Sequence, residues 1–234
     1  MYLTVVKYSK FVGDVVPRFE SVLGKEFVKT SLAVRNQYSH DESHHESKLP
    51  DVVVVPKFVE QVSSIVKICN ENKIPVIPFG TGTGIEGGVV PVRGGVTVDL
   101  RAMDQVLEVN EQDFDCTVQP GITRKKLNEI IRDTGLFFTV VLPNGDVLYT
   151  KGKSRRPWKS SAGYNLMDLF IGQEGTLGII TNACVQLHPR PSVLSAAVCS
   201  FETIREAVES VVGIKQSSIP VARMEFLDSV QIEA

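Results

Sequence analysis

The residues best suited to chemistry form a glycine-rich loop that follows the apolar segment Ile77-Pro78-Phe79. Five glycines fall within nine positions of the stretch Gly80-Thr81-Gly82-Thr83-Gly84-Ile85-Glu86-Gly87-Gly88. Residues without Cβ let backbone N–H groups converge, so such a loop can bind a phosphate group or another anion. Two threonines in the loop add hydroxyl donors. The composition therefore favours a diphosphate-binding loop, and a flexible hairpin without a ligand is the alternative.

The same loop contains Gly82-x-Gly84-x-x-Gly87, which has the spacing of the dinucleotide-binding fingerprint. That fingerprint works only where the loop opens a helix whose N-terminus receives the pyrophosphate. Here Pro91 and the pair Gly94-Gly95 follow before the next apolar segment, and these residue types disfavour a helix. A Rossmann nicotinamide site is therefore the weakest of the functions that the sequence allows.

A second glycine cluster, Gly172-Gln173-Glu174-Gly175-Thr176-Leu177-Gly178, follows a short predicted helix and runs into an apolar strand. Its glycines allow a backbone to pass close to a flat ligand. An ordinary tight turn before a strand would have the same composition. This cluster alone leaves both interpretations open.

The elements that position these loops can be predicted from hydrophobic periodicity. Strand 52–55, helix 58–72 and strand 74–79 form a β-α-β unit, which predicts a right-handed parallel crossover. Thr123 can cap a helix that runs to Thr134, with Gly135 at the C′ position. Asn144-Gly145 between two strands predicts a type I′ hairpin turn. The other predicted elements are helices near 17–24, 28–36, 165–170 and 202–216, and strands 96–100, 106–109, 116–119, 137–142, 147–150, 177–187, 193–201 and 221–227.

Composition excludes several classes of function. The chain has 234 residues, 25 Lys+Arg against 27 Asp+Glu, and a net charge of −2, so no long-range field attracts nucleic acid or an anionic membrane. No stretch approaches the roughly 18 apolar residues of a membrane span. The four cysteines form no C-x-x-C pair, which is typical of small core residues in a reducing compartment. No G-x-S-x-G elbow and no closely spaced carboxylate pair is present.

Two clusters of polar residues could suggest other sites. His40, His44 and His45 lie among acidic residues, but no apolar shell surrounds them, which predicts a solvated loop rather than a metal site. The basic stretch 151–159 around Trp158 is more typical of a solvated loop, or of a cation near a ligand mouth, than of nucleic-acid binding. No metal ligand is predicted.

Taken together, the motifs resemble a known family. The resemblance rests on Leu49-Pro50-Asp51 before Val52–Val55, on Ile77–Gly84, on Val118-Gln119-Pro120-Gly121 and on Gly172–Thr181. In this order they are similar to the FAD-binding domain of vanillyl-alcohol oxidase-type flavoproteins, also called the p-cresol methylhydroxylase type. The segments His40–Ser43, Ser161–Leu166 and Val221–Asp228 are similar to mitochondrial FAD-dependent D-lactate dehydrogenases. The resemblance covers nearly all of the chain from Phe27 onward.

This resemblance implies an α+β fold with a two-subdomain FAD-binding domain and FAD as the cofactor. The loop residues that would hold the FAD pyrophosphate are Pro78, Gly80, Thr81, Gly82, Thr83, Gly84, Gly87 and Gly88. Pro120 and Gly121 would line the flavin. The adenosine half would lie along Glu174, Gly175, Gly178, Ile179 and Ile180, largely against main chain.

The sequence departs from the family in two places. Phe138 runs directly into Thr139, where the family has a long glycine- and alanine-rich segment that contacts FAD, so we expect an internal deletion near 138–139. The family's substrate-binding cap, with its catalytic histidine, metal ligands and substrate-binding arginines, would follow Asp228 and is essentially absent. The sequence therefore names no catalytic residue.

The expected organisation is an N-terminal polar and helical segment (1–48), an FAD-binding domain (49–190) and the start of an α+β cap domain (191–234). The resemblance implies a D-2-hydroxyacid dehydrogenase acting on D-lactate, with hydride transfer to flavin N5 and an electron acceptor such as cytochrome c. It also implies a mitochondrial protein, although the first residues show no clear transit peptide. The alternative is an inactive remnant that binds FAD poorly or not at all.

Overall fold

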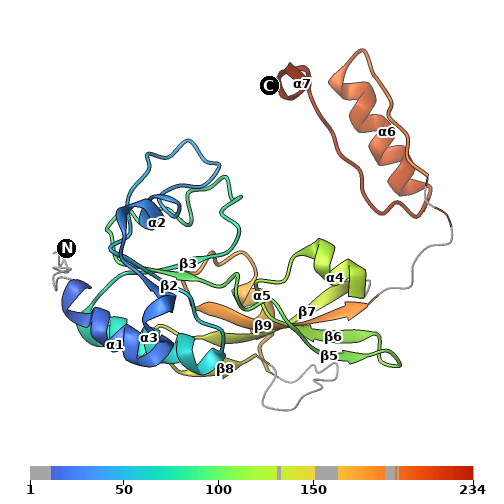
Figure 1. Cartoon of the computed structure of the whole chain (residues 1–234). Coiled ribbons are helices and arrows are strands. Elements are labelled where there is room, and N and C mark those ends of the chain that lie inside the picture. The colour runs from blue at the N-terminus through green and yellow to red at the C-terminus, as the bar shows by residue number, and fades with distance from the viewer. Residues whose placement is uncertain (1–11, 131–132, 151–162, 188–192, 194, 234) are drawn as a thin grey trace. The chain divides into compact units, whose positions relative to one another are not determined.

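The computed structural model describes residues 12–130, 133–150, 163–187, 193 and 195–233, which form two separate units (Figure 1). The first unit comprises residues 1–190 and the second comprises residues 191–234. Within the described residues, no helix combines the length and apolar character needed to cross a membrane. The finer division of the first unit between residues 48 and 49 stays a prediction.

The first unit opens with a four-stranded sheet whose strand order is β1-β2-β4-β3. Strand β1 is antiparallel to β2, whereas β2 and β3 both run parallel to β4. The predicted β-α-β unit is therefore confirmed as parallel, with β4 inserted between its two strands. The strands are β1 (Val28–Lys29), β2 (Val52–Val54), β3 (Val76–Phe79) and β4 (Val96–Asp99). Their helices are η1 (Val12–Val15), α1 (Val16–Leu23), η2 (Lys25–Phe27), α2 (Leu32–Asn36) and α3 (Val59–Asn72).

Helices cover both faces of this sheet because the side chains of β2 alternate. Val52 and Val54 pack in the main hydrophobic cluster with α1 and α3. Val53 points to the opposite face, where it packs with Tyr38 and Phe79 and with the half-buried Val34 of α2. Figure 1 shows α1 and α3 together on one side of the sheet and α2 on the other. The helix predicted at 28–36 was partly wrong, because residues 28–29 pair with β2 instead.

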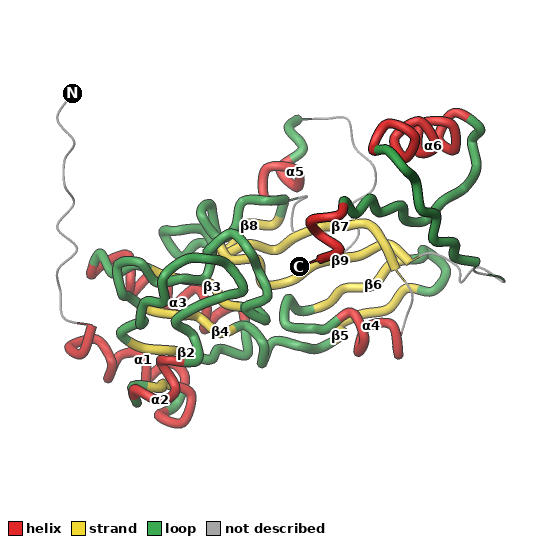
Figure 2. The backbone as a smooth tube through the Cα atoms, turned by 90° about the horizontal axis from the view of Figure 1, so that it is seen from above, coloured by secondary structure: helices red, strands yellow, loops and turns green. Residues whose placement is uncertain are grey.

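A five-stranded antiparallel sheet completes the first unit, with the order β5-β6-β9-β7-β8. Its strands are β5 (Val106–Asn110), β6 (Asp115–Val118), β7 (Asp133–Val141), β8 (Val147–Tyr149) and β9 (Ile179–Leu187), with helices α4 (Arg124–Ile130) and α5 (Leu166–Phe170). Figure 2 shows β7 and β9 side by side as the long strands of this sheet. Val141 and Ile179 also join the main hydrophobic cluster of the first sheet. The two sheets therefore share a core.

The predicted helix from Thr123 to Thr134 was wrong at its C-terminal end. Thr123 does cap α4, since its Oγ1 accepts the Lys126 N–H at 3.2 Å. However, α4 ends at Ile130, and β7 begins at Asp133, so Gly135 lies in a strand rather than at a helix C′ position. Backbone pairing with β9, from Asp133 opposite Leu187 to Val141 opposite Ile179, outweighs the local helical pattern.

The hairpin predicted around Asn144-Gly145 is confirmed, but its turn type was wrong. The Gly145 N–H donates to the Leu142 carbonyl at 2.8 Å, which makes Pro143 and Asn144 the central residues of the turn. Gly145 has φ +84°, whereas Asn144 has no positive φ, as a type I′ turn would require. Pro143 favours this arrangement because its ring fixes φ at the first central position.

The second unit contains two helices, α6 (Ile204–Gln216) and α7 (Ser229–Glu233). A capping box opens α6: Thr203 Oγ1 accepts the Glu206 N–H, and Glu206 accepts the Thr203 N–H. The strands predicted at 193–201 and 221–227 are not formed among the described residues of this unit. A strand needs a hydrogen-bonding neighbour, and no pairing joins these two segments.

Candidate functional site

The glycine-rich loop leaves β3 at Phe79, at the carboxyl end of the parallel strands. Phe79 lies opposite Asp99 in the β3–β4 register, so the loop starts where β4 ends. No helix follows the loop within residues 80–95, which agrees with the argument against a Rossmann site. Ligands of parallel sheets commonly bind outside the carboxyl ends of the strands. The loop therefore occupies a suitable place for a cofactor.

The backbone of the loop is open at two of its glycines. A Cβ on Gly80 would meet no atom within 4 Å, and on Gly84 only an oxygen of Asp41 at 3.9 Å. Gly82 differs, because it has φ +74° and its Cβ would lie 2.9 Å from the Phe79 ring. The side chains of Thr81 and Thr83 are hydrogen-bonded to each other at 3.0 Å. The loop thus combines fixed points with an exposed backbone surface that a ligand can approach.

The segment before β2 holds the far end of the loop in place. The Glu42 N–H donates to the Gly84 carbonyl at 3.0 Å. His45 packs directly on Gly87, where a Cβ would lie 2.3 Å from the imidazole Cδ2 and where φ is +79°. Hydrogen bonds from Ser43 lower the pKa of the buried Asp41, which faces the same glycines. The histidines expected in a solvated loop therefore include one that supports the glycine loop.

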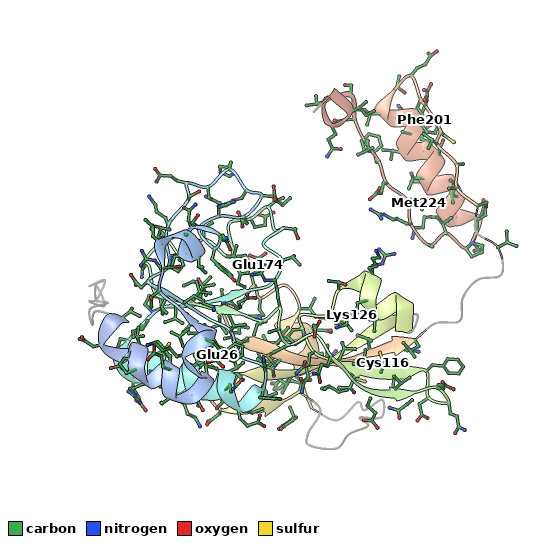
Figure 3. All side chains as sticks on the ribbon, in the orientation of Figure 1. Glu26, Cys116, Lys126, Glu174, Phe201 and Met224 are labelled. Carbon is green, nitrogen blue, oxygen red and sulfur yellow. The ribbon has the colours of Figure 1, made fainter. Side chains whose placement is uncertain are left out.

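The second glycine cluster lies against the first. A Cβ on Gly175 would lie 2.8 Å from Cγ of Pro78, and a Cβ on Gly88 would lie 3.3 Å from Oε2 of Glu174. Figure 3 labels Glu174, which takes φ +51° in this turn. Two clusters about 90 residues apart in the sequence are thus brought together, as the resemblance implied.

Gln173 fixes the shape of this second turn, although its role was not predicted. Its side chain accepts the Leu177 N–H at 2.8 Å and donates to the Gly178 carbonyl at 3.1 Å. Its backbone carbonyl accepts the Thr176 hydroxyl at 2.6 Å. The sequence feature that could have indicated this role is a glutamine within the glycine cluster. Its side-chain amide can both donate to a backbone carbonyl and accept from a backbone N–H of the turn.

A cavity of about 460 Å³ adjoins the second turn. Four of the residues expected to contact the cofactor line it, namely Pro78, Gly175, Gly178 and Ile179. Other lining residues include Cys69 in the C-terminal half of α3, Lys73 just after that helix, and Leu142 at the β7–β8 turn. Burial raises the pKa of the Cys69 thiol to about 12, so this cysteine is an inert part of the wall. Ile180 lies one position further along β9, opposite Val140.

The Pro120-Gly121 turn lies at the end of β4. A Cβ on Gly121 would lie 2.4 Å from the Leu100 carbonyl oxygen and 2.8 Å from Cα of Arg101. The Gly121 N–H also donates to the Met103 carbonyl at 2.8 Å. Only glycine fits this contact, so the Pro120-Gly121 turn packs closely against Leu100 and Arg101, the residues that follow β4.

A buried polar cluster at the same strand ends was missed in the sequence. The Tyr38 hydroxyl donates to Asp99 Oδ2 at 2.8 Å, and Arg101 binds both Asp99 oxygens through Nε at 3.0 Å and Nη2 at 2.9 Å. Burial, and then the Asp99 carboxylate, raise the pKa of Tyr38 to about 12. The sequence feature that could have indicated this cluster is Asp99, which directly follows the apolar segment Val96–Val98. In the structure this segment pairs with β3, the strand that precedes the glycine loop.

The other clusters singled out in the sequence form no second site within the described residues. Among the described residues, no three His, Cys, Asp or Glu side chains converge as a metal site would require. The basic stretch 151–159 lies outside the described residues. The candidate site is therefore the edge formed by the glycine loop, the 173–178 turn and the end of β4.

Comparison with family models matches both units. Residues 50–148 match an FAD binding domain, and residues 190–234 match the C-terminal domain of FAD linked oxidases. The FAD-binding match contains the glycine loop and the Pro120-Gly121 turn. The cofactor of this fold is thus FAD.

Curated relatives agree with this match. The chain is 47% identical to a probable mitochondrial D-lactate dehydrogenase of Danio rerio, with 95% of this chain and 52% of the relative covered. It is 37% identical to the mitochondrial D-lactate dehydrogenase [cytochrome] 1 of Saccharomyces cerevisiae, with 95% of this chain and 44% of the relative covered. The chain spans about half the length of these relatives.

Solved structures share the fold. The chain superposes on p-cresol methylhydroxylase with a TM-score of 0.73 at 24% identity, covering 87% of this chain and 48% of that one. It superposes on alkyldihydroxyacetonephosphate synthase with a TM-score of 0.71 at 22% identity, covering 91% and 47%. These similarities confirm the predicted α+β fold class of the vanillyl-alcohol oxidase type. The chain therefore belongs to the family of FAD-dependent oxidoreductases that includes the mitochondrial D-lactate dehydrogenases.

Proposed function

We propose that this chain is the FAD-binding portion of a mitochondrial D-2-hydroxyacid dehydrogenase whose substrate is D-lactate. One observation carries the proposal. The glycine loop follows directly after β3, and its backbone is open at Gly80, inside the region that matches an FAD binding domain. The mitochondrial D-lactate dehydrogenases among the relatives support the substrate and the location.

The residues at this edge fit FAD. A diphosphate can approach Gly80 and Gly84 because no Cβ fills the space above their backbone. The threonine hydroxyls of the loop pair with each other and can turn to a phosphate oxygen. We assign the diphosphate to Pro78, Gly80–Gly84, Gly87 and Gly88. The adjoining 460 Å³ cavity supports placing the adenosine half along Glu174, Gly175, Gly178, Ile179 and Ile180. The flavin would then lie toward Pro120 and Gly121.

The chemistry that bound FAD supplies is acceptance of a hydride from the α-carbon of the 2-hydroxy acid. The part of this chain is to bind and orient the cofactor. Two relatives, from Arabidopsis thaliana and Saccharomyces cerevisiae, are named D-lactate dehydrogenase [cytochrome], which supports a cytochrome as the electron acceptor. No residue of this chain is assigned as the base that takes the substrate's hydroxyl proton.

We also propose that this chain lacks an internal segment next to Phe138-Thr139. The Danio rerio and Saccharomyces cerevisiae relatives match over 259 and 268 residues, which exceeds the 234 residues of the whole chain. The matched region of the relatives therefore contains residues without a counterpart here. In the structure this position lies inside β7, and the pairing with β9 shifts register between Thr139 and Val140. If the missing segment makes contacts to FAD in the relatives, its loss would favour the alternative hypothesis that this chain is a remnant that binds FAD poorly.

Reconstitution with FAD separates the two functions. The purified chain should bind FAD, shift the flavin absorbance and melt at a higher temperature as FAD is added. Gly80→Ala should leave the melting temperature without FAD unchanged, because its Cβ meets no protein atom. It should weaken FAD binding at least about tenfold, because the methyl group fills the space assigned to the diphosphate.

Gly213→Ala is the matched control, because a Cβ there also meets nothing within 4 Å but lies on α6 of the second unit. It should leave FAD affinity unchanged. A chain that melts cooperatively yet shows neither flavin absorbance nor an FAD-dependent melting shift would support the remnant instead.

A further inference from the structure

Arg101 lies between the two motifs that were assigned to the cofactor. Its guanidinium carbon is 5.5 Å from the centre of the Phe79 ring, and the same ring contacts Gly82 of the glycine loop. Its backbone contacts Gly121, which belongs to the turn assigned to the flavin side.

Asp99 and Tyr38 fix the orientation of the Arg101 guanidinium. Asp99 accepts from both Nε and Nη2, and Nη2 also donates to the Tyr38 hydroxyl at 2.7 Å. The rings of Tyr38 and Phe79 meet edge to face at 4.8 Å, and the guanidinium lies near both. A guanidinium fixed by a carboxylate and by aromatic rings loses little entropy when it binds a further anion.

One end of this guanidinium stays available. The Asp99 side chain is 6% exposed, whereas the Arg101 side chain is 49% exposed. In the described part of the chain, Nη1 takes part in no hydrogen bond. Asp99 also raises the pKa of Arg101, so the group keeps its positive charge. A fixed cation with free N–H donors is thus presented beside the glycine loop.

We propose that Arg101 is a cofactor-binding residue, whose Nη1 group donates to a phosphate oxygen of the FAD diphosphate held by the glycine loop. This inference rests on the proposed FAD site. A diphosphate is the anion that the loop is built to hold, and arginine recognises phosphate through paired N–H groups. Tyr38 and Asp99 are then positioning residues, because they act on the cofactor only through Arg101.

Binding measurements on the full chain test this contact. Arg101→Gln should weaken both FAD and ADP about tenfold, since one charge-assisted hydrogen bond is lost from each. Arg101→Lys should lose less, because lysine keeps the charge but not the bidentate pair with Asp99. Added NaCl should weaken FAD binding more in the wild type than in Arg101→Gln, because only the wild type has the phosphate-facing cation.

Arg18→Gln is the matched control. The Arg18 side chain is also 49% exposed and pairs with Glu71 at 2.8 Å, but it lies on α1, which packs on α3 rather than on the glycine loop. It should leave both affinities unchanged. Because Arg101→Gln leaves Asp99 buried without its cation, the double variant Asp99→Asn/Arg101→Gln is measured as well, and it should show the same loss.

The outcomes are distinguishable. If the wild type binds FAD and either glutamine variant binds FAD and ADP equally well, the role of Arg101 is wrong while the FAD site stands. A loss for FAD without a loss for ADP would place Arg101 at the flavin and also overturn the phosphate contact. If the wild type binds neither ligand, the proposed function itself fails.

Discussion

The Tyr38 hydroxyl links two charged residues at the ends of the parallel strands. It donates to Asp99 and accepts from Arg101, and the tyrosine is only 6% exposed. A buried carboxylate is costly unless its oxygens are hydrogen-bonded, and here both oxygens are. The cluster therefore stabilises the strand ends from which the candidate site is built.

Tyr38→Phe should reveal this stabilisation through its pH dependence. The pKa of Tyr38 is raised from 10.0 to about 12, so the folded state holds the phenolic proton more tightly than the unfolded chain does. The resulting stability is complete below pH 10 and is lost as the pH rises from 10 toward 12. We expect the wild type to be more stable than Tyr38→Phe by roughly 1–2 kcal/mol at pH 8, with a smaller difference above pH 10. Urea unfolding of both proteins across this range measures it, and a constant difference would contradict the assignment.

Individual residues were predictable to different degrees. The glycine loop could be recognised as a candidate phosphate-binding loop because that hypothesis depends only on the composition of nine consecutive residues. The Tyr38–Asp99 pair could not, because its partners are 61 residues apart and meet only after the first sheet has formed. Likewise, nothing in the sequence couples His45 to Gly87, although the absence of a Cβ at Gly87 makes room for the imidazole.

At the scale of elements, local patterns predicted most strands of both sheets but missed β1 and the start of β7. Strands β2, β3 and β4 are continuous apolar runs bounded by turn residues, and each was predicted within two residues of its observed limits. The start of β7 was missed because Asp133 and Thr134 were assigned to the last turn of a helix, with Gly135 at its C′ position, whereas the pairing partner of this segment is the distant strand β9. Hydrogen bonding to the neighbouring strand decides where β7 begins, and the local sequence does not reveal which strand that neighbour is.

Helix α3 connects the two sheets through a buried hydrogen bond. Ser63 donates to the Gly145 carbonyl at 2.5 Å, and a Cβ on Gly145 would lie 2.9 Å from the Ser63 carbonyl oxygen. Ser63→Ala would leave that carbonyl buried without its donor, so it should lower the free energy of unfolding by about 1–2 kcal/mol. Chemical denaturation provides the measurement.

Ser64→Ala is the matched control, because the Ser64 hydroxyl bonds only to the Glu60 carbonyl within the same helix. It should change stability by less than about 0.5 kcal/mol. Equal losses in the two variants would show that the hairpin does not depend on Ser63.

At the scale of the whole molecule, the two units differ in how much apolar surface they bury. All three hydrophobic clusters lie within residues 12–187. In the second unit, Ala207 is the only buried hydrophobic residue among those described, while Val198 is 99% exposed. Helix α6 was predicted from its hydrophobic periodicity. The flanking strands could not form without a paired neighbour.

Thiol labelling should separate these two units in one experiment. Cys69 is fully buried, its pKa is raised to about 12 by that burial, and Cys116 is fully buried in the second sheet. Cys199 is exposed in the second unit. At pH 8 a thiol reagent should therefore modify Cys199 rapidly and leave Cys69 and Cys116 unmodified, because only an accessible thiolate reacts. Cys199→Ser should remove the fast phase, and increasing urea should release the slow thiols together as the first unit unfolds. Rapid modification of Cys69 in the absence of denaturant would show that α3 does not pack on the first sheet as described.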